Sequence, residues 1–285
     1  MTFRVVVPGS TSNLGAGFDF VGLALQLHLT IEISDGYGPA VYGGTLADFD
    51  PGTDLIHQKL AGDGLLDSRT LKVHSEIPIA RGLGSSGAAI VGANVAHRLI
   101  RAERVIRKEI FDEARDEEGH PDNVAASVYG GLIFVGPEPR RARLHPDLGI
   151  ALVVPETALP TQEARMVLPR SVPREVAVDQ ASRAVALFEG LTTGEPDLIG
   201  WGMGDVIAVP SRAGLIQGFS EAAGAALEAG AFGVTISGSG STLLAICQTD
   251  KTSSIADLMA AALDEAGNPA TPHSPSVADL GYQID

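Results

Sequence analysis

The sequence predicts an α+β fold, because its strand candidates come in pairs followed by helices and do not alternate strictly with them. A chain of 285 residues with 45% hydrophobic content can bury a substantial core, in one large domain or two small ones. Runs rich in branched and aromatic residues indicate the strands. These are expected at Phe3–Val7, Leu27–Ile33, Leu71–His74, Leu132–Val135, Ile150–Val154, Gly233–Ile236 and Leu243–Cys247.

Helices are expected where apolar residues recur at helical spacing. They are placed at Ser85–Arg101, Ile106–Glu117, Asp122–Val128, Glu175–Thr192, Asp197–Val206, Ile216–Ala229 and Ser254–Ala266. The first of them is apolar on nearly all sides, which is typical of a buried helix. The proline-rich segment 136–141 is expected to form a surface turn, and the tail 268–276 a loop or a poorly ordered lead-in to a strand.

Charge and composition argue against several classes of protein. A net charge of −15 would repel the phosphates of nucleic acid and an anionic membrane surface. The single cysteine, Cys247, lies in an apolar run and cannot form an intramolecular disulfide, so a buried structural thiol is expected. No apolar run approaches the length of a membrane span, and the strand at Phe3–Val7 leaves no room for a signal peptide. A cytoplasmic protein is therefore expected.

The segment from Pro78 to Ala89 places a glycine-rich turn directly before a helix. Glycine permits left-handed backbone conformations and the close approach of a ligand. Ser85 and Ser86 stand where free backbone amides and the positive end of the helix dipole attract an anion. The pattern is typical of a phosphate site, although an ordinary loop-to-helix junction eased by glycine would have the same composition.

Two familiar nucleotide motifs do not account for this segment. The chain has no Gly-x-x-x-x-Gly-Lys-Ser/Thr, and no lysine lies in a glycine-rich loop. Residues 82–87 have the spacing Gly-x-Gly-x-x-Gly, but they follow Pro78 and a loop in place of a hydrophobic strand, which disfavours a dinucleotide fold. The prediction is a cradle of backbone amides and hydroxyls, with charge neutralisation left mostly to a metal ion.

Three segments, in order along the chain, resemble the motifs of the GHMP small-molecule kinases, the superfamily of galactokinase, homoserine kinase and mevalonate kinase. They are residues 8–19 (PGSTSNLGAGFD), 78–87 (PIARGLGSSG) and 233–242 (GVTISGSGST). Within the superfamily the chain is most similar to the homoserine kinases, through residues 118–123, residues 161–169 and the segment around Arg212. Gly9 stands where alanine is usual and Ser241 where proline is usual, and neither change removes a functional group.

The resemblance implies two domains with the active site between them. Residues 1–154 would form an ATP-binding domain like domain 2 of ribosomal protein S5, and residues 155–285 a ferredoxin-like domain, the two meeting near Val154. It also implies ATP and Mg²⁺, and phosphorylation of the side-chain hydroxyl of L-homoserine to O-phospho-L-homoserine in threonine biosynthesis. Another GHMP kinase acting on mevalonate, a sugar or shikimate is the nearer alternative. The resemblance leaves a homodimer open, and the sequence shows no apolar stripe that identifies an interface.

The resemblance places the ATP phosphates against two loops. The assigned residues are Pro78, Ile79, Ala80, Arg81, Gly82, Leu83, Gly84, Ser85, Ser86 and Gly87 in the first loop, with Gly238, Ser239 and Gly240 in the second. Magnesium prefers oxygen ligands, and Ser86 and Glu118 are the residues expected to supply them. Glu117 and Asp112 compete with Glu118, since all three belong to one carboxylate run that is otherwise typical of a solvated helix face.

The acceptor residues follow from the same resemblance. Arg165 and Arg212 are expected to bind the substrate carboxylate, because the planar guanidinium forms paired hydrogen bonds with it. Asp19 would accept from the substrate ammonium or hydroxyl group. The remaining catalytic and orienting candidates are Asn13, Asn123, Thr161 and His120. His120 is either a general base or a support of the substrate site, and support is expected because phosphoryl transfer has a loose transition state.

Two other classes are less compatible with these motifs. A non-catalytic nucleotide-binding regulator on the same fold would bind ATP without turnover, but the chain retains all three motifs. A serine hydrolase would need a nucleophile elbow that leads from a strand into a helix, whereas residues 237–241 lead into another predicted strand.

Overall fold

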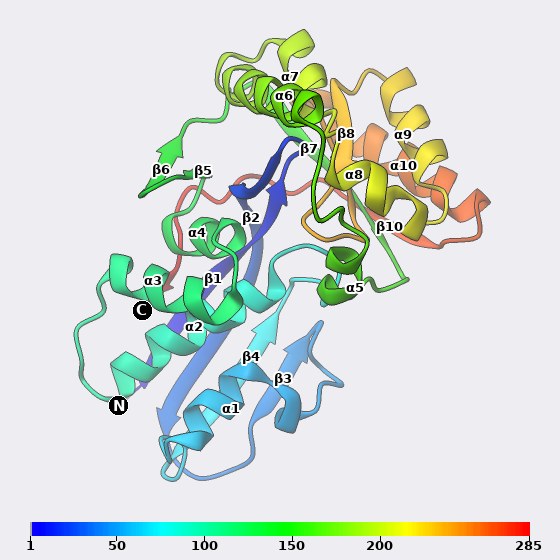
Figure 1. Ribbon diagram of the computed structural model, residues 1–285. Helices are drawn as coiled ribbons and strands as arrows, with labels where there is room; N and C mark the ends of the chain where they lie inside the picture. Colours follow the sequence, from blue (N-terminus) through cyan, green and yellow to red (C-terminus); the bar gives the residue numbers. More distant parts are fainter. Residues whose placement is uncertain (1) are drawn as a thin grey trace.

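The computed structural model describes residues 2–285 and confirms the α+β class, with two sheets and helices packed on them (Figure 1). In the larger sheet the strand order is β11-β1-β2-β4-β3, and β5 pairs with both β2 and β6. Its strands are β1 (Thr2–Asn13), β2 (Gly17–Asp35), β3 (Val41–Gly44), β4 (Arg69–Ser75), β5 (Leu132–Val135), β6 (Pro139–Ala142) and β11 (Gln283–Ile284).

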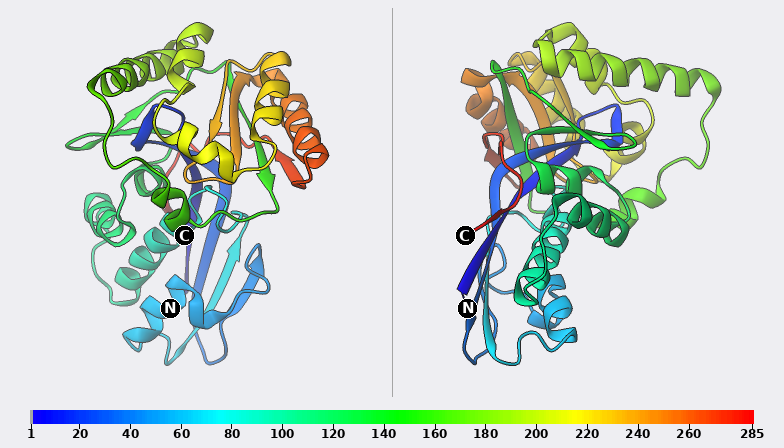
Figure 2. Two further views of the ribbon diagram at one scale, coloured as in Figure 1. Left: turned by 45° about the vertical axis from the view of Figure 1, so that its right-hand side comes forward. Right: turned by 90° about the vertical axis from the view of Figure 1, so that its left-hand side faces the viewer.

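The long β1–β2 hairpin organises this half of the molecule. Its antiparallel register runs from Thr2 opposite Ser34 to Asn13 opposite Gly17. Alternate residues such as Val5, Val7 and Ile31 are fully buried, as expected for a sheet with one covered face. The covering helices are α1 (Leu55–Gly62), α2 (Ser85–Ile100), α3 (Arg107–Glu118) and α4 (Asp122–Tyr129). They lie on one side of the sheet in the right-hand view of Figure 2.

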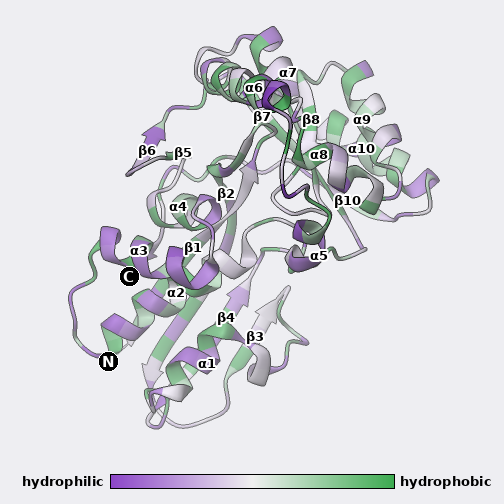
Figure 3. Ribbon diagram, viewed as in Figure 1, coloured by the Kyte–Doolittle hydropathy of each residue, from purple (hydrophilic) through white to green (hydrophobic). Residues whose placement is uncertain are grey.

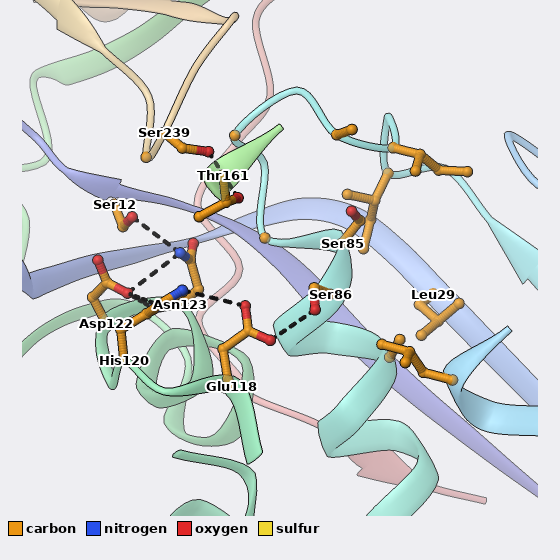
Figure 4. A pocket seen from close by; sticks show the side chains of 18 of the residues that line it. Ser12, Leu29, Ser85, Ser86, Glu118, His120, Asp122, Asn123, Thr161 and Ser239 are labelled. Carbon is orange, nitrogen blue, oxygen red and sulfur yellow. Dashed lines mark hydrogen bonds and ion pairs between the residues drawn. The ribbon is translucent and has the colours of Figure 1, made fainter. Parts of the chain in front are cut away.

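Burial of the helices follows their composition. Most of α2 is buried, as its apolar sequence predicts. The outer helix α3 is largely hydrophilic (Figure 3) and buries only Ile110, Phe111 and Ala114. The end of α3 and the start of α4 nevertheless lie close to the start of α2 (Figure 4), which brings three chain segments to one place.

The second sheet is antiparallel, in the order β10-β7-β9-β8. Its strands are β7 (Leu148–Pro155), β8 (Gly233–Ile236), β9 (Leu243–Gln248) and β10 (Ala270–His273). Ala245 and Cys247 belong to the core cluster with residues of α9 (Phe219–Glu228) and α10 (Thr252–Glu265). Leu244 and Ile246 lie on the other face of β9 and share a cluster with residues of α6 (Arg174–Thr193) and α7 (Pro196–Met203). Helices therefore cover both faces of this sheet, and Cys247 is buried as predicted.

Several local expectations need correction. The predicted surface turn at 136–141 contains β6, because residues 139–142 pair with β5. The tail at 268–276 contains β10, which pairs with β7. Four elements were not expected from the sequence: β3, α1, α5 (Thr161–Met166) and α8 (Ala208–Arg212). The helix predicted to end at Val206 ends at Met203, and the one predicted from Ile216 begins at Phe219.

Strand β7 ends at the division that the resemblance implies between residues 154 and 155. Residues 148–153 of β7 pair with β9 and residues 152–155 with β10, so this strand belongs to the second sheet. The C-terminal strand β11 then returns to the larger sheet beside β1. Between them, the two sheets bring the β1–β2 turn, the start of α2 and the β8–β9 loop to a shared boundary, where the functional candidates lie.

Candidate active site

A cavity of about 340 Å³ lies at this boundary and contains most of the candidate residues. Its wall includes the glycine-rich turn and the start of α2 at Ser85 and Ser86, seen close up in Figure 4. A charged end is formed by Asp19, Arg165 and Arg212. An apolar end, which sequence analysis missed, is formed by Leu29, Leu46, Phe49, Ile56 and Ile77.

The glycine-rich turn has the geometry of an anion site. Helix α2 begins at Ser85, its N-cap residue Gly84 is left-handed, and no side chain caps the helix. The amides of the first helical turn therefore remain available to a ligand. A Cβ atom on Gly84 would lie 2.2 Å from Ser10 Oγ, and one on Gly82 2.1 Å from the Ser237 carbonyl oxygen. Only glycine fits at these two positions, where the backbone also has positive φ.

The three sequence motifs meet around this turn. Gly238 N donates to the Ser12 carbonyl at 3.1 Å, which joins the third motif to the first. Ser237 Oγ lies 2.8 Å from Thr11 Oγ1 and 2.7 Å from the Gly82 carbonyl oxygen. These contacts explain why three segments that are distant from one another in the sequence form one wall of the cavity.

The two candidate asparagines hold this wall together. Asn123 accepts from Ser10 Oγ at 2.8 Å through Oδ1 and donates to Ser12 Oγ at 3.1 Å through Nδ2. Asn13 Nδ2 donates to the Gly238 carbonyl at 2.9 Å, while its Oδ1 accepts from the Asp19 amide at 3.0 Å. Both amide groups are thus engaged with protein partners at the edge of the cavity, and they fix the loops that face it.

Glu118 and Ser86 together offer oxygen ligands suited to a magnesium ion. Ser86 Oγ donates to Glu118 Oε2 at 2.7 Å across the gap between α2 and α3 (Figure 4). The Glu118 side chain is 11% exposed, and burial raises the pKa of its carboxyl group, although the Ser86 hydrogen bond opposes this. Of the competing carboxylates, Glu117 pairs with Lys59 at 2.6 Å and Asp112 with Lys108 at 2.8 Å. The geometry therefore favours Glu118.

The charged end pairs residues from both halves of the chain. Arg165, on α5, forms two hydrogen bonds with the Asp19 carboxylate at 2.7 and 3.2 Å. Arg212, on α8, is 3% exposed and donates to the Ala164 and Gly238 carbonyl oxygens. The two guanidinium carbons lie 5.6 and 5.3 Å from the centroid of the Phe18 ring. The two guanidinium groups are thus held beside the Phe18 ring, and of the two only that of Arg165 pairs with the Asp19 carboxylate.

His120 is held at the start of α4 by carboxylates on either side. Its Nδ1 lies 3.3 Å from Asp122 Oδ1, and its Nε2 lies 3.6 Å from Glu118 Oε1. The hydrogen bond with Asp122 raises the pKa of His120, although burial opposes this. Asp122, which sequence analysis did not select, is 2% exposed and also accepts from the Asn123 amide at 2.7 Å.

Not every predicted loop residue reaches the cavity. Arg81 instead donates to the backbone carbonyl oxygens of Ile79, Pro155 and Glu156, which ties the loop to the end of β7. The other predicted residues outside the cavity lining are Pro78, Leu83, Gly87 and Gly240. Thr161 does reach it, and its Oγ1 lies 3.2 Å from Ser239 Oγ.

Comparison with known proteins agrees with this geometry. Residues 53–131 match the model for the GHMP kinases N terminal domain, and residues 199–268 the model for the GHMP kinases C terminal domain. A homoserine kinase from Moorella thermoacetica is 37% identical over 276 residues, covering 92% of this chain and 93% of that protein. One from Desulfitobacterium hafniense is 34% identical and covers 99% of both chains. The chain belongs to the homoserine kinase family of the GHMP kinases.

Solved structures of related kinases have the same fold as this chain. The crystal structure of homoserine kinase from Cytophaga hutchinsonii has a TM-score of 0.85 and 25% identity, covering all of this chain and 97% of that one. A mevalonate kinase structure has a TM-score of 0.67 at 15% identity, which shows a shared fold alone. The predicted two-domain GHMP kinase fold is confirmed. Within residues 2–285, no helix is both long and apolar enough to cross a membrane.

Proposed function

We propose that the protein phosphorylates the side-chain hydroxyl of L-homoserine with ATP and forms O-phospho-L-homoserine, a step of threonine biosynthesis. One observation carries the proposal: a single cavity is lined both by the uncapped start of α2 and by two arginines, Arg165 of α5 and Arg212 of α8. The first feature suits a polyphosphate and the second suits a carboxylate. The relatives at 34–37% identity that are named homoserine kinase support the same reaction.

In this proposal the ATP phosphates lie along the glycine-rich turn, and the adenine ring of ATP lies at the apolar end of the cavity. Ser86 and Glu118 would hold Mg²⁺, which when bound neutralises charge on the phosphates. Gly238 and Ser239 would line the cavity next to the glycine-rich turn, where Ser239 meets Thr161. The role left to the protein is then to position the acceptor and exclude water.

The charged end suits an acceptor that carries both an ammonium and a carboxylate. Asp19 and Arg165 pair with each other. An acceptor that separates them must therefore offer a positive group to Asp19 and a negative group to Arg165. The homoserine ammonium would pair with Asp19, and its carboxylate with Arg165 and the buried Arg212. Mevalonate has no ammonium and would leave Asp19 unpaired, while a neutral sugar would replace neither charge. The geometry thus favours an amino acid over those acceptors.

The remaining features of the proposal concern organisation and location. We propose two domains centred on the two sheets, with the change near β7. The two matched family segments, residues 53–131 and 199–268, lie on either side of it. The net charge of −15 supports a small-molecule enzyme that binds no nucleic acid, and a cytoplasmic location remains our proposal.

An assay of acceptor-dependent ADP release would test the proposed reaction. With MgATP, homoserine is expected to give a kcat/KM at least about 100-fold above those of mevalonate, galactose and shikimate, because none of these three satisfies both charges of the site. Threonine carries both charges but has its hydroxyl on Cβ in place of Cγ, so its kcat/KM tests the placement of the hydroxyl and is expected to be lower as well. ATP binding without turnover on any acceptor would contradict the proposal and favour a regulator. Preferential turnover of another acceptor would keep the kinase and change its substrate.

The His120→Gln variant is expected to keep kcat within about tenfold of the wild type. A general base must be neutral, whereas the hydrogen bond with Asp122 raises the pKa of His120 and so extends its protonated range toward higher pH. If His120 were the base, activity would fall as pH decreases through its pKa, and the variant would lose that acid limb. The pH profile of kcat for both proteins is the measurement. A drop of about a thousandfold together with loss of the acid limb would contradict the support role.

A further inference from the structure

A second cavity lies at the place where the two sheets and the C-terminal segment meet. Its volume is about 720 Å³, a size typical of small-molecule sites. Its lining comes from the start of β5, from β6 and the segment that leads into β7, and from Val277 and Asp279. It shares no lining residue with the candidate active site. The proposed reaction therefore does not account for this cavity.

Basic side chains are concentrated along the second cavity. Strand β6, the edge strand at the left of Figure 1, is hydrophilic in Figure 3. This strand and the residue after it hold three arginines, Arg140, Arg141 and Arg143. The last two line the cavity together with His145, and Asp279 is the one carboxylate among its lining residues. In a chain with a net charge of −15, this local excess of positive charge favours an anionic ligand.

Most of the hydrogen-bonding capacity of the two arginines is available to a ligand. Arg143 is exposed, and within residues 2–285 its side chain has no hydrogen bond or ion pair. Arg141 donates from Nη2 to Asp279 Oδ1 at 2.9 Å. Its guanidinium lies against Gly131, where a Cβ atom would be 2.7 Å from Arg141 Nε. A guanidinium has five N–H donors, so Arg141 retains donors for a second anion.

Backbone hydrogen bonds fix the walls that carry these groups. Gly131 N donates to the Ala278 carbonyl at 2.7 Å, which joins the start of β5 to the C-terminal segment. His145 N donates to the Leu191 carbonyl of α6 at 2.9 Å. His145 Nδ1 accepts from the Asp147 amide at 3.4 Å, so a neutral imidazole carries its proton on Nε2 and can donate from there. The basic groups thus stand on segments that the fold holds in place.

The rest of the lining includes apolar side chains. Leu132 and Leu148 are buried, and Leu144 and Val277 are partly buried. Apolar walls with a few polar groups are typical of sites that bind organic molecules. A ligand that uses the whole cavity therefore carries both an anionic group and an apolar group.

We propose that the second cavity binds a small organic phosphate. The phosphate group accepts from Arg141, Arg143 and His145, and the apolar part of the ligand packs on Leu144 and Val277. A phosphate fits these donors better than a carboxylate, because its terminal oxygens and double charge serve two guanidinium groups at once. The proposal does not depend on the proposed activity, since its tests measure binding and not turnover.

Isothermal titration calorimetry of the full-length protein with phenyl phosphate tests the site, because this probe combines a phosphate with an apolar ring. The wild type is expected to bind it saturably, and Arg143→Ala to raise the Kd about tenfold. Because Arg143 has no partner within the described chain, the change should not disturb the fold. A wild type that does not bind, or an unchanged Kd in Arg143→Ala, would overturn the proposal.

Two further arginines serve as controls for the position of the probe. Arg174 is also exposed and has no hydrogen bond or ion pair among residues 2–285, but it lies on α6 outside the cavity. Arg174→Ala should therefore leave the Kd within about twofold of the wild type. Arg212→Ala should leave it equally unchanged. Weaker binding in Arg212→Ala without weaker binding in Arg143→Ala would place the probe in the first cavity and contradict the proposal.

The Asp279→Asn variant is expected to bind phenyl phosphate about threefold more tightly than the wild type. The change removes the carboxylate from the lining and releases the N–H of Arg141 that it occupies. The Asp279 side chain is 85% exposed, and a gain of affinity does not arise from a damaged fold. Equal or weaker binding in this variant would show that the ligand does not approach Arg141, which the proposal requires.

A comparison of probes tests the chemical class of the ligand. Phenyl phosphate is expected to bind at least about tenfold more tightly than inorganic phosphate, which has no apolar group, and than benzoate, which carries a single charge. Benzoate binding as tightly as phenyl phosphate would replace the phosphate with a carboxylate. Inorganic phosphate binding as tightly would show that the apolar lining takes no part, and either result would overturn an organic phosphate as the ligand.

Discussion

The Glu118→Gln variant is expected to lose about 100-fold in kcat and to need at least about tenfold more Mg²⁺ for half-maximal activity. The change removes one negative ligand and keeps the shape of the side chain. Ser86 Oγ, which donates to Glu118 Oε2 at 2.7 Å, would retain a partner, so the fold should be unaffected. Steady-state kinetics at several Mg²⁺ concentrations would measure both effects.

The pH dependence of the Mg²⁺ requirement gives an independent readout. Protons and Mg²⁺ compete for the Glu118 carboxylate, and burial raises its pKa, so protonation begins at a higher pH than for an exposed glutamate. The wild type should therefore need more Mg²⁺ as pH falls, and this dependence should weaken in the variant. Glu117→Gln is the control, because Glu117 pairs with Lys59. Full activity in Glu118→Gln with loss in Glu117→Gln would assign the metal to the neighbouring residue.

The glycine-rich turn and its junction with α2 were predictable from the sequence because their signal is local. Glycines at 82 and 84, two serines and an apolar helix are consecutive, and the structure starts α2 at Ser85 as predicted. Helix α1 also carries a local signal that was overlooked: Asp54 accepts from the amides of Ile56 and His57 as an N-cap. Strand β3 offers no comparable signal, since two of its four residues are glycine and its pairing with β4 is parallel and distant in sequence.

The rest of the site depends on contacts that no local pattern encodes. The apolar end of the cavity draws residues from β2, the segment before α1, α1 itself and the segment after β4, each of which resembles ordinary core. Phe18 acquires a role only because α5 and α8 bring two arginines to its ring. Asp122 likewise looks like a helix-start residue until folding places His120 and Asn123 against its carboxylate. Arg165 and Arg212 were found through resemblance to a family, since spacing alone does not distinguish them from surface arginines.

Arg212→Ala is expected to raise the KM for homoserine by roughly 30-fold to 1,000-fold, which corresponds to a lost charge-assisted pair of about 2 to 4 kcal/mol. Arg212 is 3% exposed, so its interaction with a carboxylate is little weakened by water. The side chain of Arg165 is 37% exposed, and its contribution should be smaller. Arg212→Lys should recover only part of the loss, because lysine keeps the charge without the planar fork.

Arg165→Ala differs in a second way, because it leaves the Asp19 carboxylate without its partner. In the complex that carboxylate would still pair with the substrate ammonium, so Asp19→Asn added to Arg165→Ala should raise the homoserine KM further, by less than in the presence of Arg165 if the two side chains act together. A double-mutant cycle on the homoserine KM would measure this coupling. In each variant the KM for ATP should change by less than about threefold, since the hydrogen-bond partners of the two arginines are Asp19, Ala164 and Gly238, none of which belongs to the glycine-rich turn or to α2. Loss of ATP binding with an unchanged homoserine KM would show that the arginine concerned serves the nucleotide and not the acceptor.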